Sequence, residues 1–318
     1  MIAESSASII RGHWEESWGT LLSGLKKILD NDPGIDLGHA LSILDKWTER
    51  DDTFLELNKK ITARNSLPTD ESGLPMLSLA AYQGRYKTIP RTVKHSHFVS
   101  NIISDYITDD TEVLVELGSG WGENLFRIYM RLINENRHIN LKYIACELTQ
   151  SGREATDLLS KTAPEMDCKT HYFNYFKPDL SFIDNWSNAL FFSSHSVEQI
   201  KSLPEEIFAE IINNSAKCQC VHIEPIGWQR FEELVTGDLS SIAGNVDPKE
   251  YIPLDPFFTR NAAILARTRD YNQNLLSLLE SLQEAGDIEI REKNFDVFGA
   301  NPFNPSTVIA WEKSKQST

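Results

Sequence analysis

The chain has 318 residues, enough to bury one large core and a smaller additional unit. Its 41% hydrophobic content and mean hydropathy of −0.34 are ordinary for a soluble globular protein. A formal net charge of −15 argues against a general nucleic-acid binder, which needs a basic surface to displace counterions. No apolar run approaches the ~20 residues of a membrane span, and the N-terminus lacks the pattern of a secretory signal. We therefore expect a cytoplasmic protein that binds neither nucleic acid nor membrane.

The four cysteines fall mostly in predicted strands. Cys218 and Cys220 are two residues apart, on one face of a strand, and no second pair has metal-binding spacing. We expect free thiols in a reducing compartment and no zinc site.

The first 66 residues are polar and have a helical pattern. A break is predicted at 31–34, where the chain reads N-D-P-G. The tryptophans and leucines at helical spacing are expected to form a core face rather than a ligand site. We expect a helical cap or an element through which a homodimer forms. The large apolar residues of this pattern are Trp14, Trp18, Leu21, Leu22, Leu25, Leu41, Leu44, Trp47, Phe54 and Leu57.

Turn-forming residues dominate the stretch 66–90, which contains three prolines and two glycines. It is interpreted as a loop or short-strand connection between the cap and the main domain. A helix is predicted from about Thr92 to Tyr106. These patterns place a domain boundary near residue 90, so that 1–90 form the cap and its connecting loop.

A glycine-rich turn stands between a predicted strand and a predicted helix. The apolar run 113–117 is typical of a buried strand, G-S-G-W-G occupies 118–122, and a helical pattern covers 124–132. Glycine permits positive φ and lets a ligand approach a backbone without a Cβ. The arrangement predicts a nucleotide-type site.

The position of an acidic residue decides which nucleotide suits the turn. A dinucleotide fingerprint would need glycine at position 123, where the chain has Glu123. Glu116 lies two residues before the first glycine, where a carboxylate would repel a pyrophosphate and attract a cationic amino-acid moiety. The E-x-G-x-G-x-G stretch resembles the first motif of the class I S-adenosylmethionine-dependent methyltransferases. The resemblance implies that Glu116 serves the methionine end of the cofactor, S-adenosyl-L-methionine. The turn residues that would make room for it are Gly118, Ser119, Gly120 and Gly122.

Predicted strands and helices alternate after the turn, which indicates a parallel sheet with crossover helices. Five parallel strands followed by a hairpin-like pair are similar to the methyltransferase sheet, and the resemblance covers about 92–318. It implies an α/β fold, a three-layer sandwich around a seven-stranded, mostly parallel sheet with a helical N-terminal extension. Residues 91–318 are expected to form the methyltransferase domain, with an irregular insertion at 227–267 as a substrate lid. The strands expected after the turn are 141–146, 170–173, 189–193, 218–223, 287–290 and 307–311.

Polar residues at two strand ends are expected to contact the cofactor. Glu147 ends the second strand, where a carboxylate can accept both ribose hydroxyls of an adenosine; an exposed acid is the alternative. Asn174 follows the third strand, at a place where the family often has a polar residue for the adenine amine, more commonly aspartate. Tyr175 could stack on the base instead. Leu148 and Ser194 complete the expected cofactor residues.

The loop after the fourth strand reads S-S-H-S-V-E-Q-I, and in the family this loop faces the sulfonium. His195 is its one imidazole, and an ordinary pKa near 6.5 suits a general base; a backbone-bonded loop histidine is the alternative. His222 and Glu224 share a face at the end of the fifth strand, so Glu224 is a second candidate base or a partner of a substrate hydroxyl. His195, Glu198 and Glu224 could hold a divalent ion. The aspartate cluster of metal-dependent catechol-type members is absent, so no metal is predicted.

The predicted function is methyl transfer to an oxygen of a small polar acceptor. The H-S-V-E-Q, H-I-E-P and N-P-x-N-P-S…W segments resemble bacterial sugar O-methyltransferases. Methylation of a natural-product scaffold or of a protein side chain is an alternative, as is a cofactor-binding module without turnover. An oxidoreductase is disfavoured by Glu116 and by Glu123. The residues expected to contact the acceptor are Tyr86, Arg91, His222 and Arg260.

Overall fold

The computed structural model describes residues 2–48, 68–69, 76–137, 140–183, 188–238 and 258–314. Two N-terminal helices, α1 (Ile2–Asn31) and α2 (Leu37–Thr48), come first. The break predicted at 31–34 is confirmed, because the first helix ends there. The side chain of Trp47, and all of Phe54 and Leu57, lie outside the described residues.

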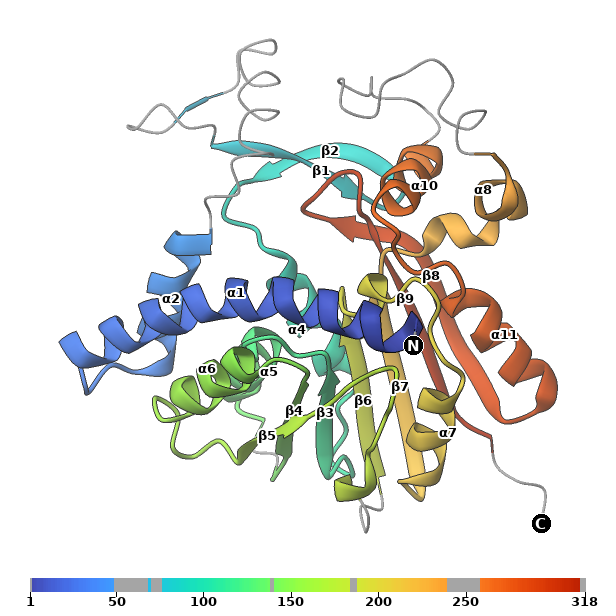
Figure 1. The fold of residues 1–318 in the computed structure, drawn as a ribbon. Coiled ribbons are helices and arrows are strands. Elements are labelled where there is room, and N and C mark those ends of the chain that lie inside the picture. Colours follow the sequence, from blue (N-terminus) through green and yellow to red (C-terminus); the bar gives the residue numbers. More distant parts are fainter. Residues whose placement is uncertain are drawn as a thin grey trace.

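A nine-stranded sheet forms the centre of the protein, in the order β2-β1-β8-β9-β7-β6-β3-β4-β5 (Figure 1). The strands from β7 to β5 in this order are parallel, and β9, β8, β1 and β2 are antiparallel to their neighbours. The bounds are β1 (Leu77–Tyr82), β2 (Arg85–Pro90), β3 (Val113–Leu117), β4 (Lys142–Glu147), β5 (Cys168–Tyr172), β6 (Asn188–Ser194), β7 (Lys217–Glu224), β8 (Ile288–Gly299) and β9 (Ser306–Lys313).

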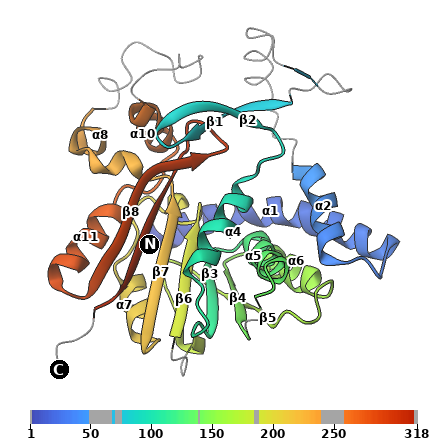
Figure 2. The same ribbon diagram turned by 180° about the vertical axis from the view of Figure 1, so that it is seen from behind.

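The predicted series of five parallel strands followed by an antiparallel pair is confirmed, but the predicted count of seven strands is wrong. The additional pair, β1 and β2, comes from the turn-rich stretch before residue 91. β1 joins the sheet because Ala81 and Tyr82 pair with the end of β8, which runs on to Gly299. Figure 2 shows the two strands arching over the sheet beside α10 (Phe258–Thr268).

Helices cover both faces of the sheet, which confirms the three layers. Side chains alternate along the strands, so Leu114 of β3 joins one buried cluster while Val113 and Val115 join the other. The first cluster contains residues of α4 (His95–Tyr106), α5 (Glu123–Asn134) and α6 (Gln150–Ser160). The second contains residues of α7 (Glu206–Asn213) and α11 (Leu275–Ala285).

The region 227–267 is more regular than predicted. It contains a 3-10 turn, η3 (Gly227–Arg230), the short helix α8 (Glu232–Thr236) and most of α10. Trp228 and alanines of α10 form a small buried cluster of their own, which explains why these turns are helical. The prolines of this region, Pro248, Pro253 and Pro256, lie outside the described residues.

Helix α1 packs against α6 and crosses from one buried cluster to the other (Figure 1). Its residues Leu22, Leu25 and Ile28 belong to the first cluster, and Ile10 packs against the second. The predicted core face is therefore confirmed for Leu22 and Leu25, which are buried within this chain, whereas Trp14 and Trp18 of the same pattern line a cavity. A homodimer through these helices and the domain boundary at residue 90 stay predictions.

All four cysteines are free, as predicted. Within the described ranges, every helix is too short or too polar to cross a lipid bilayer.

Truncation of Leu25 tests whether α1 belongs to the main core. Its side chain is fully buried, so Leu25→Ala should lower the free energy of unfolding by about 2–5 kcal/mol. Lys26→Ala, on the exposed side of the same turn, should change it by less than about 0.5 kcal/mol. Urea denaturation of both variants measures the difference, and equal stabilities would contradict the packing of α1.

Candidate active site

A cavity of about 280 Å³ lies at the carboxyl ends of β3, β4 and β6. β3 pairs with β4 on one side and with β6 on the other, so the chain changes direction across the sheet at this point. Ligands of open parallel sheets bind at such a reversal of strand order. The cavity therefore lies where an α/β sheet can bind a nucleotide.

The glycine turn after β3 forms the floor of this cavity. Gly118, Gly120 and Gly122 have φ values of 72°, 56° and 78°, a region that residues with a Cβ rarely adopt. A Cβ on Gly118 would lie 2.5 Å from the Cβ of Ser196, so space as well as φ requires glycine. Gly122 is the N-cap of α5 and is not among the residues that line the cavity.

Glu116 places a carboxyl group without full hydrogen bonding against the cavity. The residue is 1% exposed; its Oε1 accepts a hydrogen bond of 2.6 Å from Asn124 Nδ2, and its Oε2 has no partner. Ser119 Oγ, which also lines the cavity, has none either. Burial raises the pKa of Glu116 to about 8, assisted by the charges of nearby acids. A cationic ligand group would satisfy this oxygen and favour its charged form.

Glu147 fixes the turn from the end of β4. Its Oε2 accepts from the amide of Gly120 at 2.9 Å, and its Oε1 accepts from the amide and hydroxyl of Thr149 at 2.8 and 2.7 Å. Burial raises the pKa of Glu147 against the opposing effect of these bonds. A carboxylate has about four acceptor positions, so about one remains for a ribose hydroxyl.

The other residues predicted to contact the cofactor line the same cavity. Tyr175 donates a hydrogen bond to the carbonyl of Leu117 at 2.9 Å, which fixes its ring against the turn. Asn174 Oδ1 accepts from the amide of Phe176, so its amide nitrogen is the group available to a ligand. Leu148 and Ser194 also line the cavity.

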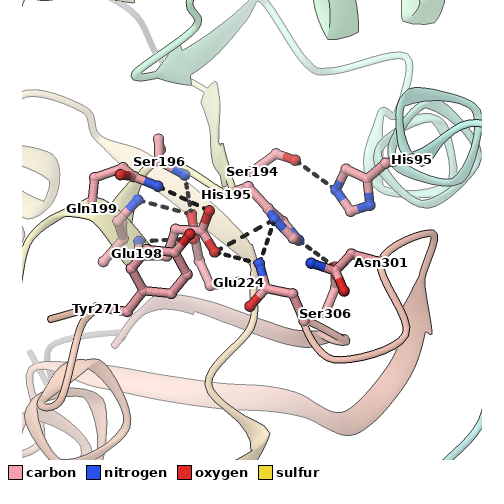
Figure 3. A network of polar contacts seen from close by, with 12 residues as sticks. His95, Ser194, His195, Ser196, Glu198, Gln199, Glu224, Tyr271, Asn301 and Ser306 are labelled. Carbon is pink, nitrogen blue, oxygen red and sulfur yellow. Dashed lines mark hydrogen bonds and ion pairs between the residues drawn. The ribbon is translucent and has the colours of Figure 1, made fainter. Parts of the chain in front are cut away.

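The loop after β6 brings His195 into a polar network at one end of the cavity (Figure 3). His195 has φ 51°, an unusual value for a residue with a side chain. Its Nε2 lies 2.8 Å from Ser306 Oγ and its Nδ1 lies 3.5 Å from Glu198 Oε2, which also accepts from Asn304 Nδ2 at 2.8 Å. Burial acts to lower the pKa of His195, but the carboxylates of Glu198 and Glu224 outweigh it and the pKa lies above its ordinary value.

Glu224 and His222 lie beneath this loop rather than in the cavity. Glu224 is fully buried, and its carboxylate accepts from the amides of Ser196, Val197 and Glu198 at 3.2, 3.2 and 3.1 Å. Burial raises the pKa of Glu224 to about 7. The geometry gives Glu224 the task of shaping the loop, and it shows no contact with the cavity that a base would need.

His222, which was predicted to contact the methyl acceptor, is buried in the sheet and is not among the residues that line the cavity. Its Nδ1 lies 3.0 Å from Ser193 Oγ and its Nε2 lies 3.5 Å from Cys220 Sγ, all within the sheet. Burial lowers the pKa of His222 to about 3. The alternation of side chains along β7 predicted that His222 and Glu224 share a face of the strand. It could not show that other parts of the chain bury both residues.

The remaining predicted acceptor contacts lie outside the lining of the cavity. Tyr86 of β2 accepts a hydrogen bond of 3.2 Å from Asn261 Nδ2 of α10. Arg91 follows β2, and Arg260 lies in α10. Figure 1 shows β2 and α10, the elements of Tyr86 and Arg260, above the parallel strands.

Three groups of this site were missed by the sequence analysis. Asn304 and Ser306 come from the turn between β8 and β9. The third is the cavity-facing side of α1, whose tryptophans were expected to form a core face only. Each of these groups reaches the site through the packing of distant elements. His95 of α4 also joins the network, because its Nε2 lies 3.1 Å from Ser194 Oγ and its ring centroid lies 4.3 Å from that of His195. In the part of the chain that the structure describes, no three His, Cys, Asp or Glu side chains are grouped to hold a metal ion.

No protein-family model matches the chain, and no curated protein does. Among solved structures, it is similar to the pyocyanin biosynthetic protein PhzM at 14% identity and TM-score 0.42, covering 70% of this chain and 57% of PhzM. The SAH-bound N-terminal domain of EvdMO1 matches at 9% identity and TM-score 0.40, over 70% of this chain and 82% of that domain. The SAH-bound Podospora anserina methyltransferase PaMTH1 matches at 11% identity and TM-score 0.39, over 72% of this chain and 80% of that methyltransferase. The function is therefore inferred from the residues of this chain.

The raised pKa of Glu116 predicts how stability depends on pH. The folded protein favours the protonated carboxyl, so the contribution is present below the ordinary pKa of 4.5 and is lost as the pH rises through about 8. Glu116→Gln should match the wild type near pH 4 and exceed its free energy of unfolding by about 3–5 kcal/mol above pH 8. Glu284→Gln, on an exposed position of α11, is the control and should follow the wild type in urea denaturation at both pH values.

Proposed function

We propose that the protein is an S-adenosyl-L-methionine-dependent methyltransferase that acts on an oxygen of a small polar acceptor, such as a sugar. The observation that carries this proposal is the buried Glu116 Oε2, which has no partner and belongs to a residue that lines a cavity beside a bare glycine turn. An amino-acid ammonium group would stabilise the charged form of this carboxyl and pair with it, whereas a phosphate would oppose that form.

The cavity offers a suitable group for each part of the cofactor. Glu116 and Ser119 suit the methionine end, Glu147 suits a ribose hydroxyl, and Asn174 with Tyr175 suits the adenine. When bound, S-adenosyl-L-methionine would supply a methyl group on a positively charged sulfur, which needs no further activation. The protein then has to hold the acceptor in line, exclude water and receive a proton.

His195 is the proposed proton acceptor. Glu198 is placed to hold the ring proton on Nδ1, which leaves the Nε2 lone pair, now facing Ser306 Oγ, to take the proton of an acceptor hydroxyl. Positive φ at this residue is backbone strain of the kind found at functional sites, and Glu224 maintains it by binding the three amides that follow. Glu224 therefore acts as a positioning residue.

The acceptor is proposed to enter between the carboxyl end of the sheet and the elements above it. Tyr86, Arg91 and Arg260 belong to those elements and offer hydroxyl and guanidinium groups to a polar molecule. Methylation of a natural-product scaffold or protein side chain would use the same cofactor site with a different acceptor. A module without turnover would bind the cofactor but give no product with any acceptor, and the His195 network favours turnover over that alternative.

Calorimetry with S-adenosylhomocysteine tests the cofactor assignment. Binding should release a proton to the buffer at pH 7, because the ligand's ammonium group would shift Glu116, with its pKa of about 8, to the charged form. Glu116→Gln should bind more weakly and release no such proton. NAD is the comparison ligand. Tight binding of NAD without binding of S-adenosylhomocysteine would refute the proposal.

Replacement of His195 and Glu198 tests the proposed base. His195→Ala should slow methyl transfer by about 10²–10⁴-fold with little change in affinity for S-adenosylhomocysteine. Glu198→Gln removes a negative neighbour and should lower the pKa of His195 from its raised value, as followed by NMR titration of the ring. Glu205→Gln, on an exposed residue, is the charge-matched control. An unchanged pKa in Glu198→Gln would show that this carboxylate does not tune the imidazole.

A further inference from the structure

We propose that helix α1 is the roof of the cofactor cavity and that Glu15 fastens it, so that cofactor release requires the N-terminal half of α1 to lift away. The inference rests on the proposed function and adds to it a wall of the binding site and a gate. It also assigns a role to a segment that lies outside the methyltransferase resemblance.

The first support is the side of α1 that faces the turn. Ile10, Trp14 and Trp18 line the cavity together with the glycine turn and Glu116. The rings of Trp14 and Trp18 are stacked with their centroids 5.1 Å apart. A Cβ on Gly120 would lie 2.9 Å from Trp18 Cζ2, so the indole rests directly on the bare backbone. A ligand on the turn is therefore enclosed between two different parts of the chain, and indole faces attract a cationic ligand.

The second support is a clasp between α1 and the start of α6. The two carboxylate oxygens of Glu15 accept from the amides of Gln150 and Ser151 at 2.9 and 2.8 Å, and Ser151 Oγ donates to the carbonyl of Glu15 at 3.0 Å. The first amides of a helix have no partner within it and carry partial positive charge, so a carboxylate binds them well. Burial opposes the charged form of Glu15, but these bonds dominate and its pKa is lowered.

The clasp lies beside the group proposed to bind the ribose. Thr149 caps α6 by accepting from the amide of Gly152 at 3.2 Å, and it also binds Glu147. Glu15 and Glu147 therefore hold neighbouring residues of the same short segment, 149–151. Loss of the clasp would therefore be expected to alter the position of Glu147 in the cavity through this segment.

The chain is built so that only part of α1 would need to move. Leu22, Leu25 and Ile28 are buried members of the main core and anchor its second half. The first half is held by the clasp, by its cavity contacts and by the partly buried side chains of Ile10 and Trp18 at the edge of the core. Gly19 separates the two halves, and nothing lies within 4 Å of where its Cβ would be. Packing does not require glycine there, but a glycine inside a helix weakens it locally and gives a place to bend.

The α2 end of the N-terminal pair is held separately. Asp45 of α2 forms ion pairs with Lys94 at 2.8 Å and with Arg127 of α5, and Arg127 Nε also binds Glu123 Oε1 at 2.8 Å. These pairs connect α2 to the first turn of α5, far along the chain from Glu15. The opening of the first half of α1 therefore does not need to disturb α2.

Release of S-adenosylhomocysteine, measured by stopped-flow chase with excess unlabelled ligand, tests the clasp. Glu15→Ala should release it about 3–30-fold faster than the wild type, because the amides of α6 lose their carboxylate. Glu16→Ala changes the same charge on an exposed position of the same helix and should release it within about twofold of the wild type. Equal release rates for the two variants would overturn the proposal.

Two further measurements keep the test independent of the fold of any one variant. Trp18→Ala should raise the Kd for S-adenosylhomocysteine at least about tenfold, with Trp18→Phe in between. In the wild-type protein, saturating S-adenosylhomocysteine should slow hydrogen exchange of the α1 amides from residue 10 to 18 more than that of α11. Unchanged exchange in α1 under saturation would refute the roof. Failure of the wild type to bind the ligand at all would instead refute the proposed cofactor.

Discussion

The bond between the Gly120 amide and the buried carboxylate of Glu147 is the constraint on which the site depends. It ties the turn after β3 to the end of β4, and Thr149 extends it to the start of α6. With one carboxylate engaged in this way, the second, Glu116, is left buried with an oxygen that has no partner. The cost of burying that group is the reason to expect a cationic ligand, since pairing is what makes a buried charge tolerable.

The buried carboxylate beneath the loop after β6, unlike that of Glu116, has hydrogen-bond partners within the protein. Glu224 is as deeply buried as Glu116, but its carboxylate accepts hydrogen bonds from three successive backbone amides. It therefore fixes the backbone of the loop and needs no ligand as a partner. The loop thus held presents His195 at positive φ beside Glu198 and Ser306. One rule, that buried charges must be satisfied, separates the proposed binding residue from the positioning residue.

Acidic side chains also attach the N-terminal helices to the body of the protein. Glu15 caps α6, and Asp45 pairs with Lys94, the N-cap residue of α4, and with Arg127 of α5. These contacts add to the apolar packing of Leu22, Leu25 and Ile28, whose burial in the first cluster also stabilises the attachment. Some of the acids that give the chain its net charge of −15 therefore serve internal contacts rather than repelling partners.

The sequence alone was sufficient for the strand, turn and helix from Val113 to Asn134, and for the series of parallel strands with its final antiparallel pair. Strand periodicity, glycine spacing and an acid at a strand end are short-range signals, and nine of the ten residues that they predicted to contact the cofactor line one cavity. Tertiary structure alone decided the pairing of β1 with β8, the satisfied carboxylate of Glu224, the covered position of His222 and the placement of Trp14 and Trp18 over the turn. Each of these depends on residues brought together from far along the chain, such as Glu15 with Ser151, and a local pattern holds no information about which side chain will fill a given space.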